Sequence, residues 1–213
     1  SLYILECINS IINQTYQDIE LVIIDDCSSD KTVEKIESIR TIAEKRFVKF
    51  IFIKNEVNKG TCCNINEMIN LSSGDFIYQM ASDDLVFGND AFEILHREVN
   101  KDSEIGMVVG DNKFIDENSK DCYINEEGEI EYHEDKKNFN SFIRYNIRNR
   151  QDLDLNSDNF FNYKSFFRGN YITNGTLIKR ECYDVGESFF KEEAPLEDWY
   201  LVLQISKKWK IKF

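Results

Sequence analysis

Two apolar segments of this chain each end in a pair of adjacent carboxylates, and this pattern limits the folds that the chain can adopt. The segment LVII leads directly into Asp25 and Asp26, and the segment FIYQMAS leads into Asp83 and Asp84. Short, β-branched apolar runs are typical of strands buried on both faces of a sheet. Adjacent like charges are unfavourable unless a positive group neutralises them. We therefore expect two strands, the first of them buried on both faces, whose ends approach a cation.

Helical and strand patterns alternate along the first half of the chain. Apolar residues at helical spacing predict helices over residues 4–12 and 91–99, a helix around 65–69 that ends near 73–74, and one helix from a Ser29 or Asp30 cap to Ala43. Strands are predicted over residues 19–24, 47–53, 75–80 and 105–109, and later over 171–179 and 209–213, with a helix over 196–206 between them.

Alternating strands and helices predict an α/β fold with a mostly parallel sheet flanked by helices. In such sheets, ligands bind beyond the carboxyl ends of the strands, where both acidic pairs fall. We expect a single domain over residues 1–213, because no linker or internal repeat interrupts the chain.

Composition excludes several classes of function. The net charge is −13, with 39 acidic against 26 basic residues, and a phosphate backbone would be repelled, so we expect no nucleic-acid partner. The six cysteines form no C-x-x-C pair and complete no zinc pattern with the two histidines, so we expect scattered reduced thiols. We also expect no signal peptide and no membrane span.

The acidic pairs allow two interpretations. Asp and Ser are preferred helix caps, so residues 25–30 and 82–84 could simply begin the helices that follow. Two pairs at equivalent strand ends favour the second interpretation, a Mg²⁺ or Mn²⁺ ion held by carboxylates together with substrate phosphates.

Four segments occur in an order and at separations that resemble the family 2 glycosyltransferases, which are inverting enzymes of the GT-A fold. They are IDDCSSDKT, NKGTCCNIN, SSGDFIYQMASDD and LEDWYLVLQIS, and the stretch ILECINSIINQTYQDIELVIIDD resembles the helix and strand before them. The resemblance covers nearly the whole chain and is weak between residues 116 and 168. It implies a nucleotide-sugar-binding half over residues 1–110 and an acceptor-binding half over residues 111–213, with an excursion over 116–168.

The resemblance also implies roles for single residues. Asp26 matches the acid that hydrogen-bonds the nucleobase, usually uracil, with Asp25 supporting the loop. Asp83 matches an acid near the ribose and a possible second metal ligand, and Asp84 matches the metal ligand itself. Asp198 matches the catalytic base, although an acid in the first turn of a helix is also favoured by the helix dipole.

Lys59, in the turn before the third predicted helix, is a candidate contact to the nucleotide, although charged turn residues are commonly just solvated. Ala81 stands where the first acid of the family's D-x-D-D arrangement often stands. The resemblance further implies that the chain begins inside the helix that follows the family's first strand, so that this strand is missing.

The excursion carries an aromatic cluster and three arginines whose roles stay open. The cluster suits either a local core or contact with a sugar, a membrane or a partner, and comprises Phe160, Phe161, Tyr163, Phe166 and Phe167. The arginines suit either a solvated face or a lipid-linked phosphate, and are Arg144, Arg148 and Arg150.

The resemblance implies a glycosyltransferase of hexosyltransferase type that uses Mn²⁺ or Mg²⁺ and a UDP-sugar donor. The expected acceptor is a glycan or lipid-linked hydroxyl in surface polysaccharide biosynthesis, and the expected location is the cytoplasm, at the inner face of the membrane if the protein associates with it peripherally. The alternatives are a non-catalytic nucleotide-sugar or glycan-binding module, and an aspartate-based phosphoryl-transfer enzyme.

Overall fold

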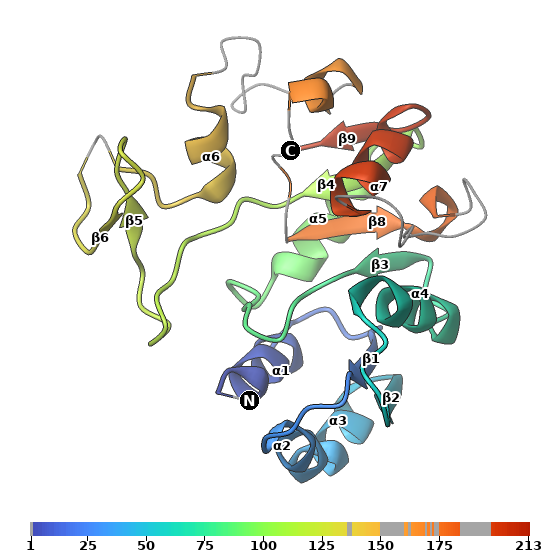
Figure 1. Ribbon diagram of the computed structural model, residues 1–213. Coiled ribbons are helices and arrows are strands. Elements are labelled where there is room, and N and C mark those ends of the chain that lie inside the picture. Colours follow the sequence, from blue (N-terminus) through green and yellow to red (C-terminus); the bar gives the residue numbers. More distant parts are fainter. Residues whose placement is uncertain are drawn as a thin grey trace.

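The computed structural model describes residues 2–135, 138–149, 160–161, 163–168, 170, 172, 175–183 and 197–213. The N-terminal part forms a layer at the bottom of Figure 1 and the rest of the chain lies above it. The elements of this first part are α1 (Ile4–Ile12), β1 (Glu20–Asp25), α2 (Thr32–Ser38), α3 (Arg40–Arg46), β2 (Lys49–Lys54) and α4 (Thr61–Leu71).

The second part is built around a larger sheet, with a small hairpin to its side (Figure 1). Its elements up to the hairpin are β3 (Phe76–Tyr78), α5 (Ala91–Val99), β4 (Ile105–Val109), β5 (Tyr123–Ile124) and β6 (Ile130–Glu131). The remaining elements are α6 (Phe142–Ile147), β7 (Phe160–Phe161), the 3₁₀-helix η1 (Tyr163–Arg168), β8 (Thr176–Lys179), the 3₁₀-helix η2 (Arg180–Cys182), α7 (Glu197–Ser206) and β9 (Lys210–Lys212).

The described strands form one mixed sheet and two small ones. Strands β1 and β2 pair in parallel, and a five-stranded sheet has the order β3-β8-β4-β9-β7. The prediction of parallel pairing is confirmed for β1–β2 and β4–β9, but β8 and β7 run antiparallel to their neighbours. The difference arises because β8 returns through the sheet between β3 and β4, which both run opposite to it and therefore run in the same direction as each other.

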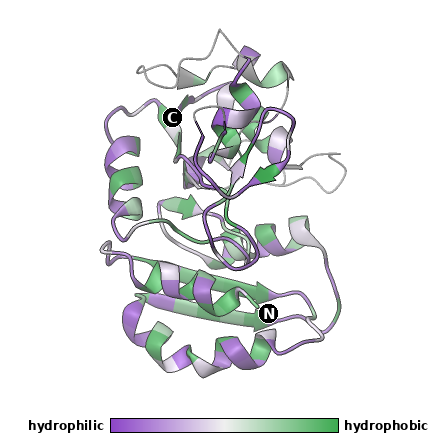
Figure 2. Cartoon of the chain, turned by 90° about the vertical axis from the view of Figure 1, so that its left-hand side faces the viewer, coloured by the Kyte–Doolittle hydropathy of each residue, from purple (hydrophilic) through white to green (hydrophobic). Residues whose placement is uncertain are grey.

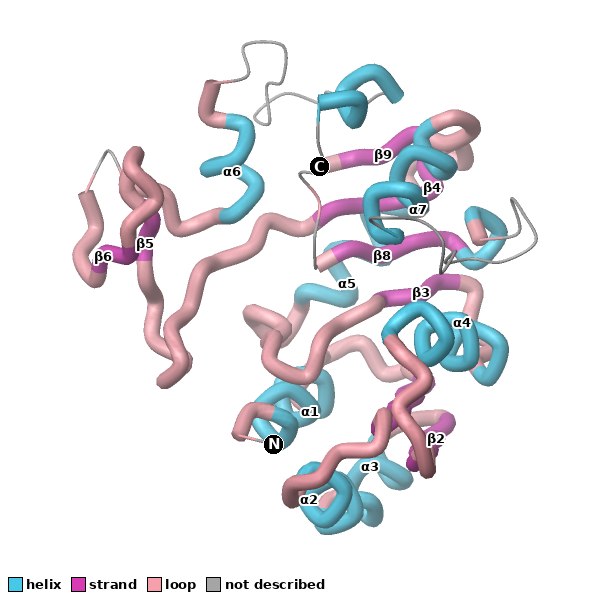
Figure 3. The backbone as a smooth tube through the Cα atoms, in the orientation of Figure 1, coloured by secondary structure: helices cyan, strands magenta, loops and turns pink. Residues whose placement is uncertain are grey.

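Helices cover both faces of the larger sheet (Figure 3). Met107 and Val109 of β4 pack into a cluster with Ile205 of α7, whereas Val108 packs into a second cluster with Leu95 of α5. The alternation follows from the two-residue period of a strand. Figure 2 shows the same principle in the lower layer, where green apolar strands lie against helices with hydrophilic purple segments.

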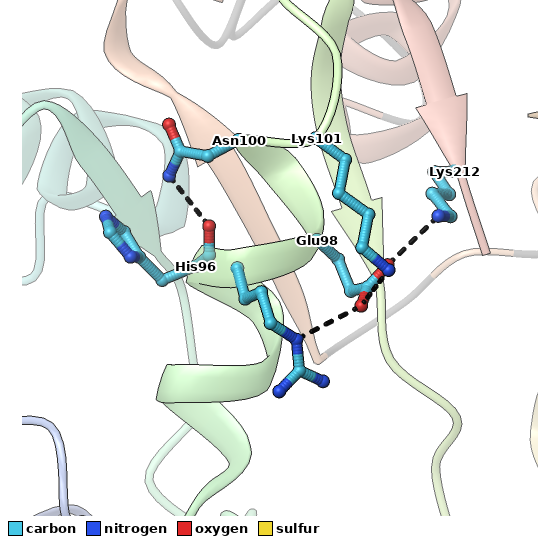
Figure 4. Close-up of polar contacts among 6 residues, drawn as sticks. His96, Glu98, Asn100, Lys101 and Lys212 are labelled. Atoms are coloured by element: carbon cyan, nitrogen blue, oxygen red, sulfur yellow. Dashed lines mark hydrogen bonds and ion pairs between the residues drawn. The ribbon is translucent and has the colours of Figure 1, made fainter.

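A polar cluster fastens α5 to the last strand (Figure 4). The Glu98 carboxylate accepts hydrogen bonds from Lys101 Nζ at 2.7 Å and from Lys212 Nζ of β9 at 3.0 Å. These donors, Lys101 first, lower the pKa of Glu98 to about 2. Glu98 is therefore ionised in the folded protein over the whole neutral range.

The predicted helix ending at Ala43 is two helices. Ile39 has φ −106° and ψ 2°, outside the helical region, and separates α2 from α3. The apolar stripe nevertheless continues, because Ile36 and Ala43 are both buried. The predicted cap was displaced by one position: Lys31 occupies the cap position, while the Asp30 carboxylate accepts the Thr32 backbone N–H at 2.9 Å.

The prediction that the first strand is buried on both faces was wrong. Leu21–Ile24 are only half-buried. Among the described residues β1 pairs with β2 alone and β3 pairs with β8 alone, so each has one edge without a strand. No helix in the described part of the chain has the length and apolar character to cross a membrane.

Candidate functional site

Asp25 and Asp26 lie where β1 ends, as predicted, and they have different environments. Asp25 is buried, with 4% of its surface exposed, and its Oδ2 accepts the Ser28 backbone N–H at 3.0 Å. The side chain therefore shapes the loop that follows the strand. Asp26 is half-buried and points across to the turn before α4.

Asp26 is held by three donors from that neighbouring segment. Its Oδ1 accepts the Lys59 backbone N–H at 2.8 Å and Asn55 Nδ2 at 3.0 Å, and its Oδ2 accepts the Gly60 N–H at 2.9 Å. The backbone donor of Lys59 is the main reason that the pKa of Asp26 falls to about 2. Asp26 is therefore a fixed, ionised acceptor at neutral pH.

Lys59 lies beside Asp26, but through its backbone. Its side chain forms an ion pair with Glu67, with 3.1 Å between Nζ and Oε2. Gly60 has a φ of 84°, which glycine adopts without strain and which lets both N–H groups of the turn face the carboxylate.

Asn55 and Asn64 were missed by the sequence analysis. Both are buried, and Asn55 Nδ2 also donates to Asn64 Oδ1 at 2.8 Å. Asn55 follows β2 directly, and its N–H donates to the Asp25 carbonyl at 2.9 Å. The rule that pointed to the acidic pairs, a polar residue at the end of a parallel strand, would also have found Asn55.

Asp83 and Asp84 lie in the loop after β3. The loop turns tightly there, since the Asp84 N–H donates to the Ala81 carbonyl at 3.3 Å. Asp83 is exposed and Asp84 is half-buried. Burial and the adjacent Asp83 charge raise the pKa of Asp84. Burial and then the Asp84 charge raise the pKa of Cys7 and of Tyr78, each to about 12.

These properties fit a divalent cation shared with a substrate. In the described part of the chain no three His, Cys, Asp or Glu side chains gather into a protein-only metal site. Mg²⁺ and similar ions are commonly held by one or two carboxylates together with substrate phosphates. The adjacent carboxylates of Asp83 and Asp84 are ligands of that kind, and a cation would relieve the unfavourable effect of the Asp83 charge on the ionised Asp84.

The loop of Asp83 and Asp84 and the segment that follows β4 leave the five-stranded sheet at the same edge. Because β3 and β4 run in the same direction, their carboxyl ends share one edge, on the left of Figure 3. A pocket of about 180 Å³ lies there between α1 and the excursion, lined by Tyr3, Glu6, Asp83, Leu85, Ile115, Asp116, Glu117 and Ser119. The excursion therefore borders the acidic loop.

Asp198 is the second residue of α7 and is exposed. Its Oδ2 accepts Asn170 Nδ2 at 2.9 Å, and its Oδ1 accepts the Trp199 N–H at 2.7 Å. Within the described residues the structure groups Asp25, Asp26 and Lys59, and separately Asp83 and Asp84. It does not bring Asp198 into contact with either group.

The excursion residues divide between core and surface. Phe161 and Phe166 are buried with ring centroids 5.6 Å apart, so the local-core interpretation is confirmed for them, whereas Phe167 is exposed. Arg144 pairs with Asp111 at 2.8 Å, and Arg148 lies over the Tyr145 ring. The Phe160 side chain and Arg150 lie outside the described residues.

Comparison with solved structures shows that the chain has the GT-A fold. The S. aureus TarS 1–349 structure in complex with UDP matches with a TM-score of 0.61 and 16% identity, over 99% of this chain and 53% of that one. The mannosyltransferase PcManGT from Pyrobaculum calidifontis, in complex with GDP-Man and Mn²⁺, matches with a TM-score of 0.67 and 14% identity, over 98% of this chain and 50% of that one.

Residues 1–172 match the model of glycosyl transferase family 2, and the chain belongs to that family. The glycosyltransferase GlyG of Streptococcus pneumoniae serotype 4 is 28% identical over 205 residues, which is 94% of this chain and 61% of that protein. The chondroitin synthase of Escherichia coli is 35% identical over 116 residues, 54% of this chain and 16% of that protein. The chain thus spans only part of these relatives.

Proposed function

We propose that this chain is the catalytic region of a metal-dependent, inverting glycosyltransferase that moves a hexosyl group from a UDP-sugar to a hydroxyl of a glycan or lipid-linked acceptor. The observation that carries the proposal is the half-buried Asp84 beside Asp83 in the loop after β3, because two adjacent carboxylates at the carboxyl edge of a sheet suit a divalent cation that can in turn bind a diphosphate. Family membership favours glycosyl transfer over the phosphoryl-transfer alternative.

Asp26 is suited to recognise the nucleobase. An ionised carboxylate offers about four lone-pair positions, and three donors from the turn and from Asn55 occupy part of them. A further position can accept the N3–H of uracil. Asp25 would support this role by fixing the loop. The Lys59 side chain, which pairs with Glu67 in the structure, would turn towards the nucleotide when it binds.

Asp84, with Asp83 beside it, would hold Mn²⁺ or Mg²⁺ against the diphosphate. A bound divalent ion acts there as a Lewis acid that neutralises the charge developing on the leaving group. Two structures of the same fold support both halves of this idea, since TarS is in complex with UDP and PcManGT is in complex with GDP-Man and Mn²⁺. Asp83 would contact the ribose.

Asp198 is the proposed general base. It takes the proton of the acceptor hydroxyl as the new bond forms on the face opposite the leaving nucleotide, so the anomeric configuration inverts. The amide of Asn170 holds one oxygen of the carboxylate, which orients it. The excursion beside the acidic loop would form part of the acceptor site.

The similarity to the chondroitin synthase of Escherichia coli favours a polysaccharide acceptor. A cytoplasmic site of action, with peripheral association to the inner face of the membrane, would bring the enzyme to a lipid-linked acceptor. The net charge of −13 argues against a nucleic-acid partner, because it would repel a phosphate backbone.

The test is sugar transfer from UDP-sugars and GDP-sugars, with the Asp198→Asn variant beside the wild type. Loss of a general base lowers kcat by about 10²–10⁴-fold. Nucleotide binding should be unchanged in this variant. Asp102→Asn is a matched control, because Asp102 precedes β4 and therefore lies at the amino end of this strand, away from the edge that carries the proposed site. Full transfer activity in Asp198→Asn would contradict the proposed base.

A further inference from the structure

A row of polar groups on α1 and just after it bonds to the segment 81–92, which contains Asp83 and Asp84. Cys7, Ser10 and Gln14 are three and four positions apart, the spacing of one helical face. The apolar residues of α1 serve the core instead, since Ile8 is buried against Ile36. The polar groups of this row have no place in the catalytic roles described above.

The first two groups bracket the acidic pair. The Cys7 thiol donates to the Ala81 carbonyl with 3.6 Å between Sγ and O, two residues before Asp83. Ser10 Oγ accepts the Val86 N–H at 3.0 Å, two residues after Asp84. Ser10 Oγ also donates to the Cys7 carbonyl at 2.7 Å, which links the two contacts.

Gln14 fixes the end of the same loop. Its side chain is buried, with 2% of the residue exposed. Its Nε2 donates to the Gly88 carbonyl at 2.6 Å and the Ser10 carbonyl at 3.1 Å, and its Oε1 accepts the Phe92 N–H at 3.2 Å. Both amide hydrogens are thus used, and a fully satisfied buried network rigidifies the groups that it joins.

Arg46 of α3 stabilises the backbone at the end of α1 and just after it. Its guanidinium donates to four carbonyls at the end of α1 and beyond, at 2.7–3.3 Å, those of Ile12, Gln14, Tyr16 and Gln17. One continuous chain of hydrogen bonds therefore runs from α3, through the residues after α1, to the loop of the acidic pair.

We propose that Gln14 and Ser10 are positioning residues that hold the loop of Asp83 and Asp84 in the geometry that binds the divalent ion and diphosphate. The inference rests on the proposed function. Groups that orient metal ligands typically change metal affinity by about 10–100-fold when removed. One hydrogen bond on each side of the pair and a buried amide at the end of its loop are support of this kind.

The test compares Gln14→Met, which keeps the size of the side chain and removes its amide, with the wild-type protein. The expected result is about tenfold weaker Mn²⁺ binding in the presence of UDP, measured calorimetrically without turnover. Metal-free hydrogen exchange of the Val86 and Phe92 amides should accelerate at the same time. Ser10→Ala should act in the same direction, and Ser10→Thr, which retains a hydroxyl, should restore Mn²⁺ affinity.

Arg180→Met is the matched control. Arg180 donates to the Gly74 and Ile69 carbonyls and to Ser72 Oγ, so its loss removes several part-buried hydrogen bonds before β3, at the end of the strand opposite to the loop of Asp83 and Asp84. If it weakens Mn²⁺ binding as much as Gln14→Met at equal loss of stability, the effect is general and the inference is wrong.

Two further results would also refute the inference. The first leaves the proposed function intact, and the second refutes the proposed function as well. Faster exchange of the loop with unchanged Mn²⁺ affinity would refute positioning and leave the proposed function intact. Absence of Mn²⁺-dependent UDP binding in the wild type would refute the proposed function, and the inference with it.

Discussion

Replacing Asp84 by Asn should make the metal-free protein more stable and at the same time abolish its response to metal. The pKa of Asp84 is raised by burial and by Asp83, so the folded state resists ionising this group. A carboxyl with a raised folded pKa binds its proton more tightly in the folded state than in the unfolded state. Stability therefore falls as pH rises through that raised pKa, and the penalty persists at pH 7.

The magnitude is small because solvent screens a half-buried side chain. Interactions between charges near the surface are commonly worth about 1 kcal/mol or less, and removing an unfavourable one should add stability of that size. For a chain of this length, about 1 kcal/mol shifts Tm by about 2–4 °C. Saturating Mn²⁺ and UDP, at about one hundred times Kd, should instead stabilise the wild type by about 3 kcal/mol.

The assay is thermal unfolding of both proteins at pH 7, with EDTA and with Mn²⁺ plus UDP. We expect the order of stability to reverse: Asp84→Asn unfolds at the higher temperature in EDTA, and the wild type unfolds at the higher temperature with ligands. Glu93→Asn, at an exposed position of α5, controls for loss of an acidic charge. A lower Tm of Asp84→Asn in EDTA would refute the argument from unfavourable ionisation.

Three other substitutions test the fold. Glu98→Gln should destabilise the protein by about 1 kcal/mol at pH 7 in urea unfolding, and the difference should shrink as pH falls below 4.5 towards 2, where the folded carboxylate takes up its proton. Gly106→Ala should lower stability by about 1–3 kcal/mol, because an added Cβ would lie 2.6 Å from both Cys182 Sγ and Trp209 Cβ; unchanged stability would contradict this packing. Asn55→Leu should cost about 1–3 kcal/mol and weaken UDP binding, because it removes a donor from Asp26 and from Asn64; a variant with wild-type Tm and affinity would show that the amide is dispensable.

Local patterns predicted the first half of the chain well. The helices α1 and α5 and the strand β4 lie where the apolar periodicity placed them. The break at Ile39 was not predictable, since the apolar stripe continues across it. The direction of β8 was also not predictable, because its partners β3 and β4 are distant in sequence and no local signal encodes strand direction.

The candidate site likewise contains residues that the sequence predicts and residues that only the folded structure reveals. The acidic pairs are visible in the sequence because both lie beside the strands that position them. Gln14 bonds to Phe92, 78 positions away, and Asn55 bonds to Asp26, 29 positions away, so only the folded chain reveals their partners. The tertiary structure adds the residues that hold the acidic side chains in place.

Titration calorimetry of UDP with the wild type and with Asp84→Ala, each with and without Mn²⁺, shows whether Asp84 holds a metal ion at a nucleotide site. We expect Mn²⁺ to strengthen UDP binding to the wild type, and we expect Asp84→Ala to remove this gain while the protein stays folded. Equal UDP affinity with and without Mn²⁺ in the folded wild type, or a gain that survives in Asp84→Ala, would contradict a metal-assisted nucleotide-sugar site at Asp84.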